Sequence, residues 1–251
     1  NGDLRKASNI LTEFEGLKST QRQNLIAAYI TRLFLKGGFE IVQQPGGSKP
    51  QMLVKDLPDT AAQDDDNDTK LESELHSFIK EAAGDDRILQ KNELRRWSRY
   101  NGRTLYAWSN RIENGATVWT MKPEEVRQVF GLRKFLKDFT LIKDRGVVEV
   151  KLWNDYLVFA SLYGIADQVM RDFRKVCPEY FRLSSSAEFF ADSATNIMIW
   201  DMINMTSRDF NVAASTYEAS LNSSSSSGGG GSSSWGGGGG FSGGGSGGGG
   251  R

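Results

Sequence analysis

Apolar residues recur every three or four positions over residues 4–36, which predicts at least two helices, each with one buried face. Gly37 and Gly38 follow the second apolar run and are expected to end that helix. The segments FEIVQQ and QMLVKDL come next and read as two short strands joined by the turn PGGSKP. Two helices followed by a small hairpin have the outline of a winged helix, so residues 4–58 are predicted to form a winged-helix-like unit.

A polar and acidic stretch separates this unit from a second hydrophobic pattern. Residues 59–70 are predicted to be an acidic linker, because this stretch contains the run AAQDDDNDTK. Residues 71–121 then resume helical spacing, with Ile88-Leu89 as a short strand or linker and residues 116–121 as a candidate strand. This part is predicted to be a second small helical or winged-helix-like unit.

Two further apolar stripes lie in residues 122–181. The first includes the FLKDF motif and the second includes WNDYLVFASLYG, which belongs to a predicted continuous helix with Gly164 inside it. These two helices are expected to pack against each other as an antiparallel hairpin. Residues 187–218 are Ser- and Asn-rich and predict a marginal last helix, and residues 219–251 predict a disordered Ser- and Gly-rich tail. The fold class expected is therefore α+β and mainly helical.

Composition sets limits on the function. The 251 residues include 31 basic and 31 acidic side chains, so the net charge gives no strong global attraction to nucleic acid or to an anionic membrane. Cys177 is the single cysteine, which rules out an internal disulfide. No run of about 20 apolar residues is present, so no membrane span is expected in this chain. The start Asn1-Gly2-Asp3-Leu4 favours a chain cut from a longer protein.

The sequence offers little for catalysis or metal binding. His76 is the single histidine, lies in an acidic helix pattern and is far in sequence from Cys177. Asp64, Asp66 and Asp68 fit the first three odd positions of an EF-hand loop, but the glycine and glutamate that the pattern requires at its sixth and twelfth positions are missing. We therefore expect no enzyme activity, no cofactor and no metal.

The stretch ELRRWSRYNGRTLYAW is the best candidate binding segment. On a helix, Arg95, Arg96, Arg99 and Arg103 share one side, and Leu94, Trp97, Leu105 and Trp108 share another. Asn101-Gly102 is a candidate interruption of this helix. A basic face beside aromatic residues suits phosphate groups of lipids or of nucleic acid. The alternative is a core helix whose arginines are solvated or paired with the preceding acidic segment. The candidate binding residues are Arg95, Arg96, Trp97, Arg99 and Arg103.

Residues 131–169, GLRKFLKDFTLIKDRGVVEVKLWNDYLVFASLYGIADQV, resemble a segment near the C-terminus of the YciQ-like predicted membrane proteins, a bacterial family defined by a domain of unknown function. Members of that family also end in a Ser-rich stretch and a GGGFSGGGSGGG-type tail closing on Arg, which residues 238–251 repeat. The close resemblance covers residues 131–181 and 223–251. Residues 4–57 resemble more loosely the winged-helix-like part that members carry on the cytoplasmic side.

The resemblance implies a place at a membrane. Family members have an N-terminal signal, an extracytoplasmic β-rich domain and membrane spans, which this chain lacks, so any attachment to a membrane would use segments absent from it. The main hypothesis is a non-catalytic, membrane-associated interaction module, the soluble C-terminal part of a predicted bacterial membrane protein. It would lie on the cytoplasmic side and dock a protein partner or anionic lipid headgroups. The alternatives are a winged-helix nucleic-acid-binding protein and an enzyme whose active site lies upstream of this chain.

Overall fold

The fold is mainly helical with one small antiparallel sheet, which confirms the predicted fold class. The computed structural model describes residues 3–42, 51–57, 67–90, 92–113, 121–138, 152–176 and 193–225. The winged-helix assignment of residues 4–58 stays a prediction, and Cys177 and the Gly-rich end of the chain lie outside the described residues.

The described strands all lie in the first ninety residues of the chain, and the described elements that follow them are helices. The helices are α1 (Leu4–Glu15), α2 (Lys18–Leu35), α3 (Asn67–Ala83), α4 (Glu93–Tyr100), α5 (Gly102–Glu113), α6 (Pro123–Asp138), α7 (Trp153–Leu162), α8 (Ala166–Val176) and α10 (Ser193–Ser225). The strands are β1 (Phe39–Val42), β2 (Gln51–Val54) and β3 (Ile88–Leu89).

Local signals account for the ends of the first two helices. The Asp3 side chain accepts a hydrogen bond from the backbone N–H of Lys6 (3.0 Å), which satisfies one of the free donors at the start of α1. Gly16, with φ of 68°, closes α1 in the left-handed conformation that glycine adopts without steric cost. Gly37 has φ of 77° directly after α2, so the glycine pair does end this helix as predicted.

The three strands form one antiparallel sheet in the order β1-β2-β3. Phe39 of β1 pairs with Val54 of β2, and Leu53 of β2 pairs with Ile88 of β3. The strand from the second predicted unit therefore completes the sheet of the first. The other candidate strand, residues 116–121, lies outside the described residues except for Met121.

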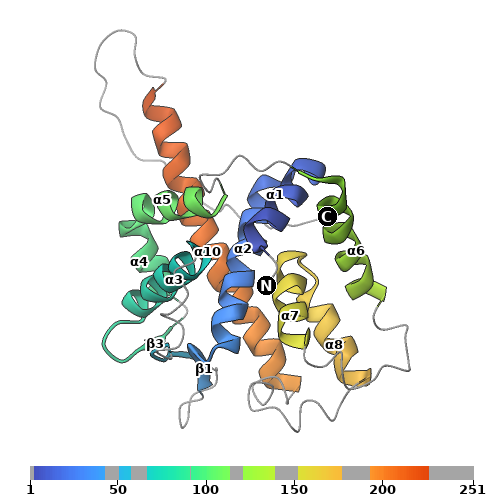
Figure 1. Ribbon diagram of the computed structural model, residues 1–251. Helices are drawn as coiled ribbons and strands as arrows, with labels where there is room; N and C mark the ends of the chain where they lie inside the picture. Colours follow the sequence, from blue (N-terminus) through green and yellow to red (C-terminus); the bar gives the residue numbers. More distant parts are fainter. Residues whose placement is uncertain are drawn as a thin grey trace, which may run out of the picture.

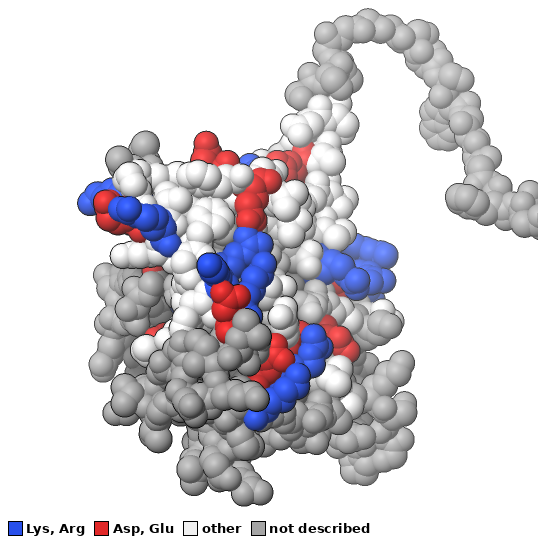
Figure 2. Space-filling model, turned by 90° about the vertical axis from the view of Figure 1, so that its right-hand side faces the viewer, with Lys and Arg blue, Asp and Glu red and all other residues white. Residues whose placement is uncertain are grey.

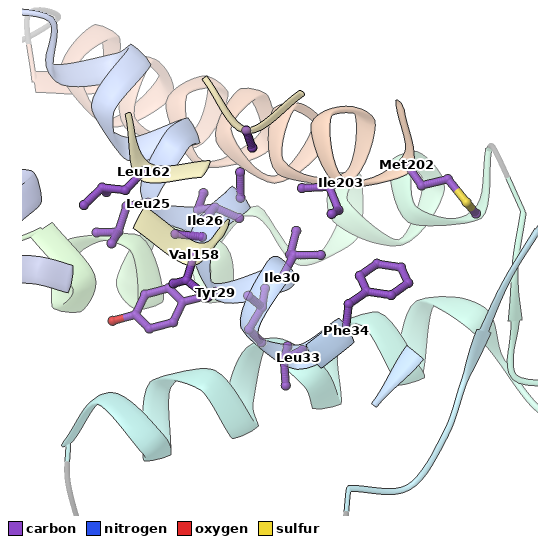
Figure 3. Packing of buried hydrophobic residues seen from close by; sticks show 14 of the residues in the cluster. Leu25, Ile26, Tyr29, Ile30, Leu33, Phe34, Val158, Leu162, Met202 and Ile203 are labelled. Carbon is purple, nitrogen blue, oxygen red and sulfur yellow. The ribbon is translucent and has the colours of Figure 1, made fainter. Parts of the chain in front are cut away.

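Helix α2 lies at the centre of the molecule. Every residue from Leu25 to Thr31 is buried, which covers nearly two full turns and thus all sides of the helix. Figure 3 shows the apolar side chains of α2 between Val158 and Leu162 of α7 and Met202 and Ile203 of α10. A helix that is apolar all round is stable only when it is surrounded, so α7 and α10 complete the core around α2.

The other helices are arranged on two sides of α2. Helices α3, α4 and α5 lie on one side, and α6, α7 and α8 lie on the other (Figure 1). Helix α10 runs alongside α2, continues past α4 and α5, and its C-terminal turns project beyond them. The last helix is therefore long and central, and it extends past the predicted end at residue 218. Its last seven residues, 219–225, fall in the predicted tail.

The predicted acidic linker is shorter than expected. Helix α3 begins at Asn67, so residues 67–70 are helical rather than linker. Asp68 is buried, forms a salt bridge with Arg5 of α1 (2.6 Å) and accepts a hydrogen bond from the Tyr29 hydroxyl (3.3 Å). The composition of the run suggested solvated carboxylates, but this one is held by a cation from a helix more than sixty positions away.

The predicted continuous helix over the WNDYLVFASLYG motif is two helices. The backbone N–H groups of Tyr163, Gly164 and Ile165 donate to carbonyls of the last turn of α7, and Gly164 has φ of 68°. This is the left-handed termination that glycine favours. The chain turns at Gly164 and starts α8 at Ala166. Gly164 is therefore a helix terminator and not, as predicted, a residue inside a helix.

Helices α6 and α7 contact each other in antiparallel directions. The Tyr163 hydroxyl donates to the Val129 carbonyl (2.9 Å), and the ring of Phe135 lies 5.6 Å from that of Tyr156. The earlier residue of α6 therefore meets the later residue of α7. The two predicted stripes do touch, but α7 packs far more extensively on α2.

A pair of glycine substitutions tests the assignment of Gly164 to a helix end. Gly164→Ala places a side chain at positive φ and 3.2 Å from Asn24, so we expect a loss of about 1–2 kcal/mol in the free energy of unfolding. Gly131→Ala is the matched control, because Gly131 lies inside α6 with open space around it. We expect this control to gain about 0.5–1 kcal/mol. Urea unfolding measures both, and a stabilising Gly164→Ala would contradict the assignment.

Candidate binding groove between α4 and α10

The predicted basic segment consists of two helices that meet at Asn101. Helix α4 ends at Tyr100, and α5 begins at Gly102. The Asn101 side chain donates to the Trp97 carbonyl (3.0 Å), which closes the end of α4. Arg95, Arg96 and Arg99 therefore belong to α4 and Arg103 to α5, so the helix is interrupted at Asn101-Gly102, the alternative that the sequence left open.

The apolar side of α4 and α5 is in the core, as the pattern predicts. Leu94, Leu105 and Trp108 are buried, and the Trp108 indole N–H donates to the Leu71 carbonyl of α3 (3.0 Å). Trp97 is half-buried, with its ring 5.7 Å from Phe78 and 6.4 Å from Phe210. Trp97 was predicted as a binding residue, and in the structure its contacts hold α4 against α3 and α10.

The four arginines point outward. Arg95 lies 3.8 Å from the carboxylate of Asp209 on α10. Arg96, Arg99 and Arg103 are exposed, and none of them forms an ion pair within the part of the chain that the structure describes. Tyr100 follows Arg99 and is 91% exposed. The end of α4 thus presents uncompensated positive charge around a solvent-exposed aromatic ring.

A groove of about 400 Å³ lies between α4 and the C-terminal half of α10. One wall comes from α4 and the start of α5 and consists of Arg95, Ser98, Arg99 and Gly102. The other wall is a single face of α10 with the spacing of an amphipathic helix, formed by Asp209, Val212, Ala213, Thr216, Tyr217 and Ser220. The α4 wall supplies cations, and Val212, Ala213 and Tyr217 of the α10 wall form an apolar floor between the two helices. This combination suits an anionic ligand with an apolar part.

The start of α5 brings the two walls close together. A Cβ atom added at Gly102 would lie 3.4 Å from the Cβ of Tyr217, so a glycine at this position lets α5 approach α10 closely. The ring of Tyr217 also packs against that of Tyr106 (5.6 Å). These contacts set the floor of the groove relative to the arginines of α4.

The α10 wall was not predicted. Its residues are more than a hundred positions from α4, and they were assigned to a marginal helix and a disordered tail. One signal for this helix face was available in the sequence, the three- and four-residue spacing of Val212, Ala213, Thr216, Tyr217 and Ser220. The serine-rich composition around these residues obscured it.

His76 has a structural environment. Its Nε2 atom lies 2.8 Å from the Lys55 carbonyl oxygen, its ring stacks on Phe39 at 5.4 Å, and the residue is 5% exposed. Burial lowers the pKa of His76 below its usual value, and hydrogen bonds to the backbone of Lys55 and Gly38 partly oppose this shift. The ring therefore joins α3 to the sheet.

A second buried polar cluster joins α2, α5 and α10. Arg22 donates to Asn211 (2.7 Å) and Ser215 (2.6 Å) and lies 3.5 Å from the carboxylates of Glu113 and Glu218. Burial raises the pKa of Glu113 above its usual value, with Arg22 and Lys18 opposing the shift. These contacts hold α5 and α10 against α2, which gives this cluster a structural role.

Metal-ligand chemistry is not assembled in the described ranges. Within them, no three histidine, cysteine, aspartate or glutamate side chains are arranged to hold a metal ion. Asp64 and Asp66 of the rejected EF-hand pattern lie outside these residues, and Asp68 is engaged by Arg5 and Tyr29.

One segment of the chain matches a known family model. Residues 119–173 match the family model described as predicted membrane protein (DUF2207), C-terminal domain, which confirms the resemblance stated for this segment. The matched residues include α6, α7 and most of α8. No curated protein and no solved structure gives a significant match.

Among the described helices, none combines the length and the apolar character needed to cross a bilayer.

The environment of His76 predicts a pH dependence of stability. Its pKa is lower in the folded state than the value of about 6.5 expected after unfolding, so below that value the unfolded chain binds more protons than the folded one. The stabilising contribution is complete above about pH 6.5 and is lost as the pH falls. His76→Gln keeps an N–H donor but does not titrate. We expect urea unfolding to show the stability advantage of wild type over His76→Gln shrinking from pH 7.5 to 5.5. An advantage that stays constant over this range would contradict the assignment.

Proposed function

We propose that this chain, which carries the C-terminal domain of a predicted membrane protein over residues 119–173, is a non-catalytic interaction module that works beside a membrane. It binds anionic lipid headgroups through the exposed cations of α4 and α5. It does so on the cytoplasmic side, where the leaflet surface is negatively charged.

The observation that carries this proposal is the uncompensated charge at the end of α4. Arg96, Arg99 and Arg103 lie exposed around Tyr100 without an ion pair to any described residue. A cation near an anionic leaflet contributes roughly 1 kcal/mol to binding, and tyrosine favours the headgroup region. Together these residues have the composition of an interfacial contact.

The face of the molecule around α6 and α8 differs from this one. Figure 2 views the molecule from the side of α6 and α8, where Lys and Arg atoms lie largely beside Asp and Glu atoms. Arg127 pairs with Glu124 (3.2 Å), Lys6 pairs with Glu125 (2.5 Å), and Arg171 pairs with Asp167. Paired charges present little net attraction to an anionic surface. Lys134 and Lys137 of α6 are exposed without a described ion pair, but the end of α4 adds an exposed tyrosine to its three arginines and is therefore the better candidate.

The alternative of winged-helix binding to nucleic acid is less well supported, because cations at the hairpin are engaged. Lys55 pairs with Glu40 (3.1 Å), and Asp56 accepts hydrogen bonds from Arg87 (2.7 Å) and Lys80 (2.9 Å). These two hydrogen bonds lower the pKa of Asp56 to about 2. A hairpin that contacts phosphates needs free cations. Here the carboxylates of Glu40 and Asp56 already bind the cations that would contact phosphate.

The non-catalytic character rests on the surroundings of the reactive groups. His76, the single histidine of the chain, faces Lys55 and Phe39 in the packed interior, and neither of these described neighbours offers it a nucleophile to activate. The buried carboxylate Glu113 faces Arg22 and Lys18.

Vesicle co-sedimentation tests the proposal. We expect the chain to sediment with phosphatidylglycerol-containing vesicles and not with neutral phosphatidylcholine vesicles, and this binding should weaken as salt rises. The triple variant Arg96→Ala, Arg99→Ala, Arg103→Ala should bind roughly a hundredfold more weakly, since each cation contributes about a factor of five.

The control is a second triple variant with the same change in net charge. Lys134→Ala, Lys137→Ala and Arg208→Ala remove exposed cations from α6 and α10 and should change vesicle binding little. Equal recovery on neutral and anionic vesicles would contradict the proposal. Duplex DNA bound more tightly than anionic vesicles, and lost in the first triple variant, would favour the nucleic-acid alternative instead.

A further inference from the structure

We infer that the groove between α4 and α10 holds the headgroup of one anionic, hydroxyl-bearing phospholipid, such as phosphatidylglycerol, with the lipid chains along α10. This inference rests on the proposed function, which is a general attraction to an anionic membrane surface. It adds one defined site that binds one lipid molecule per chain. It is carried by four features of the groove: its paired arginines, its acceptor oxygens, its apolar floor and its size.

Two arginines of α4 face the groove together. Arg95 and Arg99 are four positions apart, so they lie on the same side of α4 with Cβ atoms about 6 Å apart. The planar guanidinium group matches phosphate oxygens in a two-pronged contact, and two such groups can hold one phosphate from both sides. The phosphate of the headgroup therefore lies between Arg95 and Arg99.

Of the two arginines, Arg95 meets an acidic group in the groove and Arg99 does not. Asp209 closes one end and lies 3.8 Å from Arg95, a distance at the outer limit of an ion pair, and Arg99 has no ion pair with a described residue. Glu218, two turns further along α10, reaches toward Arg22 instead (3.5 Å). The negative charge of Asp209 orients Arg95 without neutralising Arg99.

Three aliphatic hydroxyl groups line the groove as hydrogen-bond acceptors. Ser98, Thr216 and Ser220 each donate to a carbonyl one turn earlier in their own helix, at distances between 2.6 and 3.1 Å. Their protons are thus used, and their oxygen lone pairs accept from a ligand. A headgroup that carries hydroxyl donors next to its phosphate satisfies both these oxygens and the arginines.

The apolar floor continues out of the groove along α10. Val212 and Leu221 are 55% and 41% exposed, and Ala213 and Tyr217 lie between them on neighbouring turns. This stripe leads to the turns of α10 that project beyond α5 in Figure 1. It offers apolar contact to acyl chains, so the headgroup and the chains each meet a matching surface.

The size of the groove favours a lipid over a peptide helix. The groove of about 400 Å³ is formed by only about two turns of α4 and three of α10, which is short for the face of a docked helix. Small ligands bind in cavities of this size, whereas a docked helix makes contacts over several turns.

The test uses dihexanoyl phosphatidylglycerol below its micellar concentration, titrated into the full chain by calorimetry. We expect saturable binding of one lipid per chain and no binding of dihexanoyl phosphatidylcholine. Arg99→Ala should weaken this binding at least about tenfold, because a charged hydrogen-bonded contact is lost. Arg208→Ala, an exposed arginine on α10 outside the groove, is the matched control and should bind as wild type does.

Filling the groove gives a second, charge-neutral test. Thr216→Trp places a large ring at an exposed position that lines the groove and should abolish lipid binding, whereas Thr216→Ser keeps the hydroxyl and should not. Circular dichroism establishes that each variant folds. Both variants retain Arg96 and Arg103, so both should still sediment with anionic vesicles.

The outcomes separate this inference from the proposed function. If anionic vesicles bind but the short-chain lipid does not, or if Thr216→Trp binds it normally, the groove inference fails and the proposed function stands. If neither vesicles nor the lipid bind, both fail. If glycerol phosphate binds as tightly as the short-chain lipid, the apolar floor is not engaged and the assignment to a lipid is contradicted.

Discussion

The burial of α2 on all its sides is the constraint on which the rest of the fold depends. Residues Leu25 to Thr31 are buried without a gap, and a helix with no solvent-facing side needs neighbours all around it. Helices α1 and α3 supply part of this cover, but α7 and α10 supply the largest share. The N-terminal helices therefore depend on residues that lie more than a hundred positions later in the chain.

Polar contacts fix how these helices meet. The hydroxyls of Thr31 on α2 and Ser161 on α7 lie 2.8 Å apart, so one donates to the other, and the accepting hydroxyl donates to a carbonyl of its own helix. Arg22 fixes α10 against α2 through Asn211 and Ser215. Because an unpaired buried charge costs several kcal/mol, these contacts select one register for each helix pair. The register of α10 on α2 also places its outer face opposite α4, so the core determines the shape of the groove.

The sequence predicted what depends on local pattern. The period of apolar residues located the helices up to α6, and it correctly separated Leu94 and Trp108 from the arginines between them. It placed Gly164 inside a helix, because periodicity does not report the sign of φ. Asp68 was assigned to a solvated linker because its cation, Arg5, belongs to a distant helix. The groove was missed for the same reason, since its two walls meet only when α10 packs on α2.

Amide hydrogen exchange on the full chain tests the central role of α2 most directly. If α2, α7 and α10 form one cooperative core, the buried amides of all three helices exchange only through global unfolding, with the free energy that urea unfolding gives. Residues 25–31, 157–162 and 199–210 should then share one exchange free energy. A markedly lower value for α7 or α10, with α2 still protected, would show that α2 is stable without them and would contradict this account.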